Sequence, residues 1–199
     1  MRKIEKGKEP IEWLCYRKTH GVHYEAKPQL REALLVEQGY LCAYCMQRIY
    51  ENNSRIEHVL SRKNHPELQL DYKNMVLCCN GKSGADYHCD RSKGESDVSF
   101  EFNDALVDTL SYDSRGAIKS SNATWDNEIN SVLNLNNDLL KRNREETING
   151  LIEGIKKWNL ANLKEVIEKW KAKDRDGKLK PYCGVAIYYL EKKILKFNR

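Results

Sequence analysis

At 199 residues, the chain is long enough for one good-sized domain, or for a small domain with a helical appendage. Its formal net charge of +5 permits a polyanionic partner such as nucleic acid but does not require one. No window approaches the ~18 uninterrupted apolar residues of a membrane-spanning helix, and the charged opening MRKIEKGKEP lacks the apolar centre of a signal peptide. We therefore expect a cytoplasmic protein with no membrane partner.

The first 27 residues show no periodicity, but Trp13, Leu14 and Tyr16 are apolar enough to dock this arm on the body of the protein. A helix is expected to begin at Pro28, because proline is favoured in the first helical turn, and to stop at Gly39. This helix would aim the chain into the first cysteines.

Two short apolar runs follow, at residues 46–50 and 55–60, and Glu-Asn-Asn-Ser separates them. This turn signal predicts a β-hairpin, whose second strand carries a Glu-His pair. Residues 61–74 are expected to form an irregular loop, because Asn, Pro and Asp interrupt them. A helix beginning near Asp90 or Arg91 would complete the order β-β-α.

Beyond Gly94 the composition changes. Residues 105–121 alternate in places and contain an Asp-Ser-Arg-Gly turn, which predicts a second hairpin. Three helices with apolar stripes are expected at residues 137–158, 159–173 and 181–197. We divide the chain into residues 1–99, which contain the cysteine-rich segment, and a mostly helical region, residues 100–199. The apolar stripes are typical of a core, with a partner-docking surface as the alternative.

Five of the seven cysteines lie between residues 42 and 89. In a reducing cytoplasm, clustered cysteines indicate a metal site more often than disulfides. Cys42 and Cys45 form a C-x-x-C pair, whose tight turn lets two thiolates bind one tetrahedral ion. Cys15 and Cys183 lie outside this segment and are expected to be small buried hydrophobic residues.

The later cysteines supply the remaining ligands. Cys89 is expected to be one, with His88 as the alternative. Cys78 and Cys79 compete for the fourth position, because adjacent residues of an extended segment point in opposite directions. A structural zinc site uses all four positions, so this ion would stabilise the fold and leave hydrolysis to a second metal.

Glu57, His58 and Asp90 are candidates for hydrolytic chemistry. An imidazole titrates near neutral pH, so His58 suits the deprotonation of a water molecule. The carboxylates Glu57 and Asp90 suit a hydrated Mg²⁺ or Mn²⁺ with open positions for phosphate. Neighbours on a strand face opposite sides, so Glu57 and His58 can share one site only if the strand bends or ends there.

Three further polar residues could complete such a site. Asn74 has one acceptor and two donors, so it can fix the loop that orients His58. Arg91 and Lys93 can hold phosphate oxygens of a substrate.

The order Glu-His, Asn, Cys and Cys-Asp-x-x-Lys resembles the ββα-metal (HNH) endonucleases. The resemblance implies an α+β fold with a zinc-stabilised ββα-metal core, in which Glu57 and Asp90 ligate the catalytic metal. It also implies that His58 is the general base and Asn74 a structural residue. A cysteine commonly stands five positions after this asparagine in the family, which favours Cys79. The expected zinc ligands are Cys42, Cys45, Cys79 and Cys89.

The sequence departs from the family pattern at two positions. Glu57 replaces the commoner aspartate before the histidine, and Asp90 replaces the commoner asparagine. Both changes keep oxygen ligands.

The chain resembles most closely the HNH proteins of the Septu anti-phage system and of some retron loci. The similar segments include EQGYLCAYCMQRI, IEHVLS, LDYKNMVLCCNG and HCDRSKG. This similarity implies that the chain cuts DNA as the effector of a two-component defence system, acting with an ABC/RecN-like ATPase. Residues 100–199 or the N-terminal arm would then bind the ATPase. The alternative is a zinc-stabilised nucleic-acid or protein adaptor that cuts nothing, which has no need of the Glu-His pair.

Overall fold

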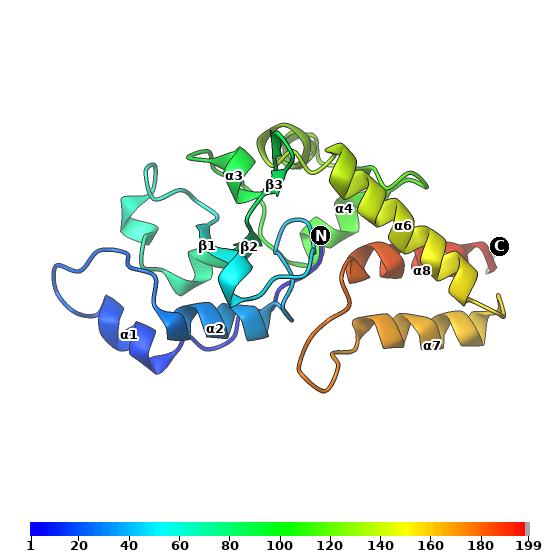
Figure 1. Ribbon diagram of the computed structural model, residues 1–199, viewed down its shortest axis with the longest axis horizontal. Coiled ribbons are helices and arrows are strands. Elements are labelled where there is room, and N and C mark those ends of the chain that lie inside the picture. Colours follow the sequence, from blue (N-terminus) through cyan, green and yellow to red (C-terminus); the bar gives the residue numbers. More distant parts are fainter. Residues whose placement is uncertain (198–199) are drawn as a thin grey trace.

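The computed structural model describes residues 1–197, which form helices and three two-stranded antiparallel sheets (Figure 1). The elements up to residue 100 are α1 (Ile11–Arg17), α2 (Pro28–Glu37), β1 (Ser54–His58), β2 (Met75–Cys79), β3 (Lys82–Ser83), β4 (Asp86–Tyr87) and α3 (Asp90–Lys93). Those that follow are α4 (Asp104–Thr109), β5 (Leu110–Tyr112), β6 (Ile118–Ser120), α5 (Ala123–Asn127), a π-helical turn (Glu128–Val132), α6 (Asp138–Gly154), α7 (Leu160–Lys171) and α8 (Cys183–Phe197). The mixed composition of helix and strand confirms the expected α+β class.

Helix α2 has the predicted boundaries. Pro28 occupies its first turn, and the chain leaves it through Gly39, which has a left-handed φ of +61°. A side chain at Gly39 would also collide with Leu179, since a Cβ there would lie 2.7 Å from that residue. Glycine is therefore favoured after this helix for two reasons: it adopts the left-handed conformation without strain, and it leaves room for Leu179. Helix α1 was not predicted from the sequence.

The strand that carries Glu57 and His58 pairs differently from the prediction. β1 pairs with β2 in antiparallel register, with Glu57 opposite Val76, so the predicted hairpin between residues 46–50 and 55–60 is wrong. Residues 51–53 instead form a 3₁₀ turn. The cause is hydrophobic burial: β2 has the sequence MVLCC, all five residues are buried, and such an apolar run needs a strand partner inside the core.

The region after residue 100 follows the prediction closely. β5 and β6 form the expected hairpin, although the residues before it form helix α4, which Asn103 caps through a bond from the Leu106 N–H. Helices α6, α7 and α8 lie together in Figure 1. Their shared apolar cluster contains Leu151, Ile155, Leu163, Ile167, Ala186 and Leu190. Most residues of the predicted apolar stripes therefore lie in the core and not on a free surface.

The N-terminal arm docks on the body, as expected. The Ile4 N–H donates to the Phe102 carbonyl at 2.8 Å, the Lys6 Nζ donates to the Met75 carbonyl at 2.6 Å, and Trp13 is buried. One continuous apolar cluster contains residues from both sides of residue 100. The division into residues 1–99 and 100–199 stays a prediction.

The two cysteines outside the central segment differ from each other. Cys183 is buried, as expected, but Cys15 is exposed, so that expectation was wrong. Cys15 lies on α1, whose buried face is occupied by Trp13.

Candidate functional site

Four cysteines form a cluster that can hold a metal ion. All four are buried, and the Sγ atoms of Cys42, Cys45, Cys79 and Cys89 lie within 4.8 Å of one another. The Sγ atoms of Cys42 and Cys89 are 3.8 Å apart, and those of Cys45 and Cys79 are 3.7 Å apart. A tetrahedral ion with metal–sulfur bonds of ~2.3 Å places its ligands ~3.8 Å apart. Two of the Sγ–Sγ distances thus match a tetrahedral site, and the four predicted ligands are close enough together to hold one ion.

Local backbone structure brings these thiols together. Two hydrogen bonds close the turn at Cys42. The Cys42 N–H donates to the Gln47 carbonyl at 2.9 Å, and the Met46 N–H donates to the Cys42 carbonyl at 3.0 Å. Cys79 is the last residue of β2, and Cys89 precedes α3. A metal held here therefore fixes the end of β2 relative to the start of α3.

The neighbouring candidates lie outside the cluster. Cys78, which is in register with Arg55 of β1, lies near Cys42 but is not one of the four clustered thiols, whereas Cys79 is. His88 is buried, with Nδ1 3.2 Å from the Cys89 Sγ and 3.9 Å from the Cys79 Sγ. The imidazole contacts two of the sulfur atoms, while the thiols form the tetrahedron.

The chemistry of the cluster also fits a metal. Burial raises the pKa of Cys45 and Cys89 well above the usual range of a thiol, because a thiolate loses its hydration there. Four adjacent thiolates are stable only with a bound cation.

Glu57 lies on one face of β1 and is only 5% exposed. The Lys93 Nζ donates to its Oε1 at 2.7 Å, and the Tyr44 hydroxyl donates to the same oxygen at 3.3 Å. The Lys93 Nζ also donates to the His58 carbonyl at 3.0 Å, and Lys93 is 3% exposed. The structure therefore places Lys93 as an internal partner of Glu57, whereas the sequence had suggested a residue that meets phosphate.

Asp90, the first residue of α3, faces the same site. Its Oδ2 pairs with the Arg55 Nε at 2.9 Å. Burial, and after it the neighbouring Asp90 carboxylate, raise the pKa of Glu57 to about 8, while Lys93 opposes this shift. Lys93 and Arg55 already lie beside this pair of carboxylates. Carboxylate oxygens are also the ligands that hard cations such as Mg²⁺ prefer.

His58 makes a separate set of contacts. Its Nε2 lies 2.9 Å from the Gln69 carbonyl, which can only accept, so Nε2 carries the hydrogen and Nδ1 is the acceptor nitrogen. Burial lowers the pKa of His58 to about 4, which keeps the ring neutral at physiological pH. The Tyr24 ring packs edge-on against the imidazole, with centroids 4.6 Å apart.

The structure thus gathers Glu57, Asp90 and Lys93, but not His58 with them. Successive residues of β1 face opposite sides, as expected, and the strand ends at His58. A single substrate atom could meet both Glu57 and His58 only at that end of the strand.

Asn74 links the two ends of the loop between β1 and β2. The Leu60 N–H donates to its Oδ1 at 2.8 Å, and its Nδ2 donates to the Leu60 carbonyl at 2.9 Å. The amide therefore replaces a backbone partner for Leu60, and the loop that it closes contains Gln69, the acceptor for His58. Asn74 thus contacts backbone atoms of its own loop, and the role that the resemblance implied for it stays a prediction.

We expect Asn74→Ala to lower the free energy of unfolding by about 1–3 kcal/mol, because it leaves the N–H and carbonyl of the half-buried Leu60 without their partner. Lys73→Ala is the control, since Lys73 precedes Asn74 in the same loop but is exposed, and we expect a change within about 0.5 kcal/mol. Urea denaturation measures both. Equal effects of the two substitutions would contradict the role given to Asn74.

Sequence reasoning missed four residues of this site: Arg55, Tyr44, Tyr24 and Gln69. Arg55 had a usable signal, because it stands two positions before Glu57 and so shares its face of the strand. The others had none, since they come from segments distant in the sequence. Arg91 is exposed, and its guanidinium lies 5.1 Å from the centre of the exposed Tyr87 ring.

Comparisons with known proteins do not assign the chain to a family: no family model matches it, and no curated protein matches it. Within residues 1–197, no helix is both long and apolar enough to cross a membrane. The functional assignment therefore depends on the residues of the site.

Proposed function

We propose that this chain is a metal-dependent HNH endonuclease that hydrolyses DNA phosphodiesters. One observation carries the proposal: Glu57 and Asp90 lie side by side, at the end of a strand whose last residue is a histidine held in one tautomer. A non-catalytic adaptor does not require paired carboxylates next to an oriented histidine. The chain order β1, β2 and, after the short strands β3 and β4, α3 is compatible with the family resemblance, and the cysteine cluster joins the end of β2 to the start of α3.

The chain's own residues would divide the work as follows. The Gln69 carbonyl holds the imidazole so that the His58 Nδ1 can take a proton from the attacking water. Glu57 and Asp90 would hold Mg²⁺ or Mn²⁺, which when bound polarises the phosphate and neutralises the charge that develops on it. Arg91, on the exposed side of α3, would bind a phosphate oxygen.

Zinc would have a structural role. The four thiols use every position of a tetrahedral ion, so no position remains for water or substrate. The ion would instead hold α3, and with it Asp90, against β1.

A plasmid-nicking assay with Mg²⁺ or Mn²⁺ tests the proposal. We expect relaxed or linear DNA only when divalent metal is present, and the assay should be run with and without the product of the neighbouring gene. Absence of cleavage under both conditions would contradict the endonuclease proposal.

The non-catalytic adaptor remains the second candidate because of one observation. Lys93 and Arg55 already neutralise both carboxylates, as they would in an ion-pair cluster that only stabilises the fold.

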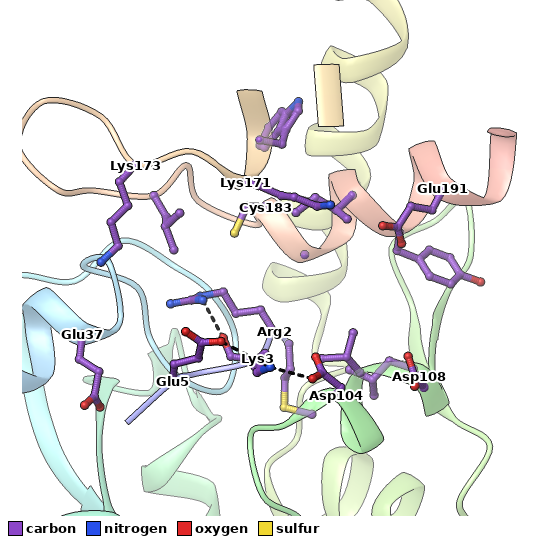
Figure 2. A pocket seen from close by; sticks show the side chains of 18 of the residues that line it. Arg2, Lys3, Glu5, Glu37, Asp104, Asp108, Lys171, Lys173, Cys183 and Glu191 are labelled. Carbon is purple, nitrogen blue, oxygen red and sulfur yellow. Dashed lines mark hydrogen bonds and ion pairs between the residues drawn. The ribbon is translucent and has the colours of Figure 1, made fainter. Parts of the chain in front are cut away.

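We further propose that the chain is the effector of an anti-phage system and binds an ABC/RecN-like ATPase. The family resemblance supports this, and the structure offers a surface for it. Figure 2 shows a groove lined by the N-terminal arm, α2, α4 and α8, in which Lys3 pairs with Asp104 at 2.7 Å. None of the candidate catalytic residues lines this groove.

We expect Leu195→Glu to weaken capture of the ATPase at least about tenfold, because Leu195 lines the groove and is 64% exposed, and a charge there opposes apolar contact. Ile11→Glu is the matched control, since Ile11 is 76% exposed on α1 and outside the groove. A pull-down with the tagged chain measures both. Equal capture by the two variants would exclude this groove.

A further inference from the structure

Two cations flank the Glu57–Asp90 pair, and they differ in access to solvent. Lys93 has a side chain only 1% exposed, and Glu57 and the His58 carbonyl engage its Nζ. Arg55 has a side chain 50% exposed and reaches Asp90 through Nε. A guanidinium has five N–H donors, so Arg55 keeps further donors for another acceptor. Arg55 is therefore the cation beside the carboxylates that a substrate can reach.

The bond between Arg55 and Asp90 conflicts with metal binding. The Arg55 Nε lies 2.9 Å from Oδ2 of Asp90, one of the oxygens that a metal ion would need. Only the Arg55 end of this pair is well solvated, since the Asp90 side chain is 14% exposed. An ion pair with one solvated partner contributes modestly to stability, about 1 kcal/mol, so new contacts to a metal and a phosphate can offset its loss. Arg55 and Glu57 also share one face of β1, which keeps the guanidinium beside both carboxylates.

We propose that Arg55 is a substrate-binding residue that exchanges partners. Without nucleic acid it pairs with Asp90. When a divalent metal and a phosphodiester bind, its guanidinium transfers to a non-bridging phosphate oxygen, and the Asp90 oxygen becomes available to the metal. A planar guanidinium suits both acceptors, since carboxylate and phosphate present similar oxygen pairs. The inference rests on the proposed function, because it assigns Asp90 to the catalytic metal.

This exchange couples the two ligands. A phosphate that removes Arg55 from Asp90 strengthens metal binding, and by thermodynamic reciprocity the metal strengthens DNA binding to the same degree. The free protein should therefore bind the metal weakly and the DNA-bound protein more tightly.

Metal and DNA affinities of full-length variants test the proposal. All proteins carry His58→Ala so that DNA stays intact, and zinc content and circular dichroism establish that they fold. Mn²⁺ binding is followed by electron paramagnetic resonance, and binding of a fluorescent DNA duplex by anisotropy in Mn²⁺. Arg142→Gln is the matched control, because Arg142 also pairs with a carboxylate, that of Glu146 at 3.0 Å, but on the exposed face of helix α6.

Without DNA, we expect Arg55→Gln to bind Mn²⁺ about two- to fivefold more tightly than the parent, because a competing ion pair is gone. We expect it to bind DNA about tenfold more weakly, because a charge-assisted bond to phosphate is lost. Arg55→Lys should recover part of the DNA affinity, and Arg142→Gln should change neither value.

Unchanged or weaker Mn²⁺ binding by Arg55→Gln would overturn the proposal, and so would unchanged DNA binding. The proposed function fails on a different result, the absence of metal-dependent nicking by the chain with His58 intact. Nicking by that chain, combined with unaltered affinities in Arg55→Gln, would reject the role of Arg55 alone.

Discussion

His58→Ala is expected to reduce DNA cleavage by about 10²–10⁴-fold, the usual cost of removing a positioned general base. The reason lies in the tautomer: the Gln69 carbonyl holds the hydrogen of Nε2, so Nδ1 is the nitrogen that can accept a proton from water. Alanine deletes that acceptor and leaves the Glu57–Asp90 pair in place. Plasmid nicking in Mn²⁺, followed over time, measures the loss.

The His58→Ala substitution should also affect the stability of the fold, because His58 is buried. Its loss leaves the Gln69 carbonyl without a partner, which we expect to lower the free energy of unfolding by about 1–3 kcal/mol. Cleavage should therefore be compared at a temperature where circular dichroism shows both proteins folded, with equal zinc content. His20→Ala is the matched control, since His20 is exposed, and it should cut at the wild-type rate.

Cleavage by His58→Ala at the wild-type rate, with contaminating nucleases excluded, would show that His58 is not the general base. If the unsubstituted chain also cuts nothing with the proposed ATPase present, the adaptor is the better description of this protein.

The sequence predicted best those features that depend on local spacing. The C-x-x-C turn, the end of α2 at Gly39 and the three C-terminal helices each depend on neighbours within a few residues, and the structure has all of them. The choice of Cys79 over Cys78 came from the family resemblance, and the structure brings Cys79 into the cluster.

Strand pairing could not be predicted in the same way. β1 had a nearby apolar run and a turn signal in front of it, but it pairs with β2, which lies after a long loop. The decision depends on how much apolar surface each pairing buries. The fully buried β2 gains more than residues 46–50, and a local turn signal contains no information about that competition.

The residues that contact Glu57 and His58 could not be predicted from the sequence either. Lys93 reaches Glu57 because the cysteine cluster brings the start of α3 beside β1, a contact between residues far apart in sequence. The partner of His58 is a backbone carbonyl, which every residue has, so no residue type marks it. Such contacts follow from the folded loop and not from a motif.

The cysteine cluster leads to the last prediction, that Cys79→Ser loses its metal and unfolds, whereas Cys78→Ser keeps both metal and fold. A structural zinc site contributes about 10–16 kcal/mol, which matches or exceeds the total stability of a typical domain, about 5–15 kcal/mol. The two substitutions make the same chemical change at adjacent buried positions, so they are matched controls for each other.

Cys79 contributes one of the four clustered Sγ atoms, 3.7 Å from that of Cys45, and serine cannot replace a thiolate for a soft-ligand ion. Cys78 lies outside the cluster, so Cys78→Ser should cost only the burial of a hydroxyl, about 1–3 kcal/mol. Metal analysis after chelator washing and circular dichroism measure the outcome. One zinc per chain in Cys78→Ser and none in Cys79→Ser is the expected result. The reverse would mean that the strand presents the other thiol, and an unchanged fold without any zinc would mean that the four thiols do not hold a structural ion.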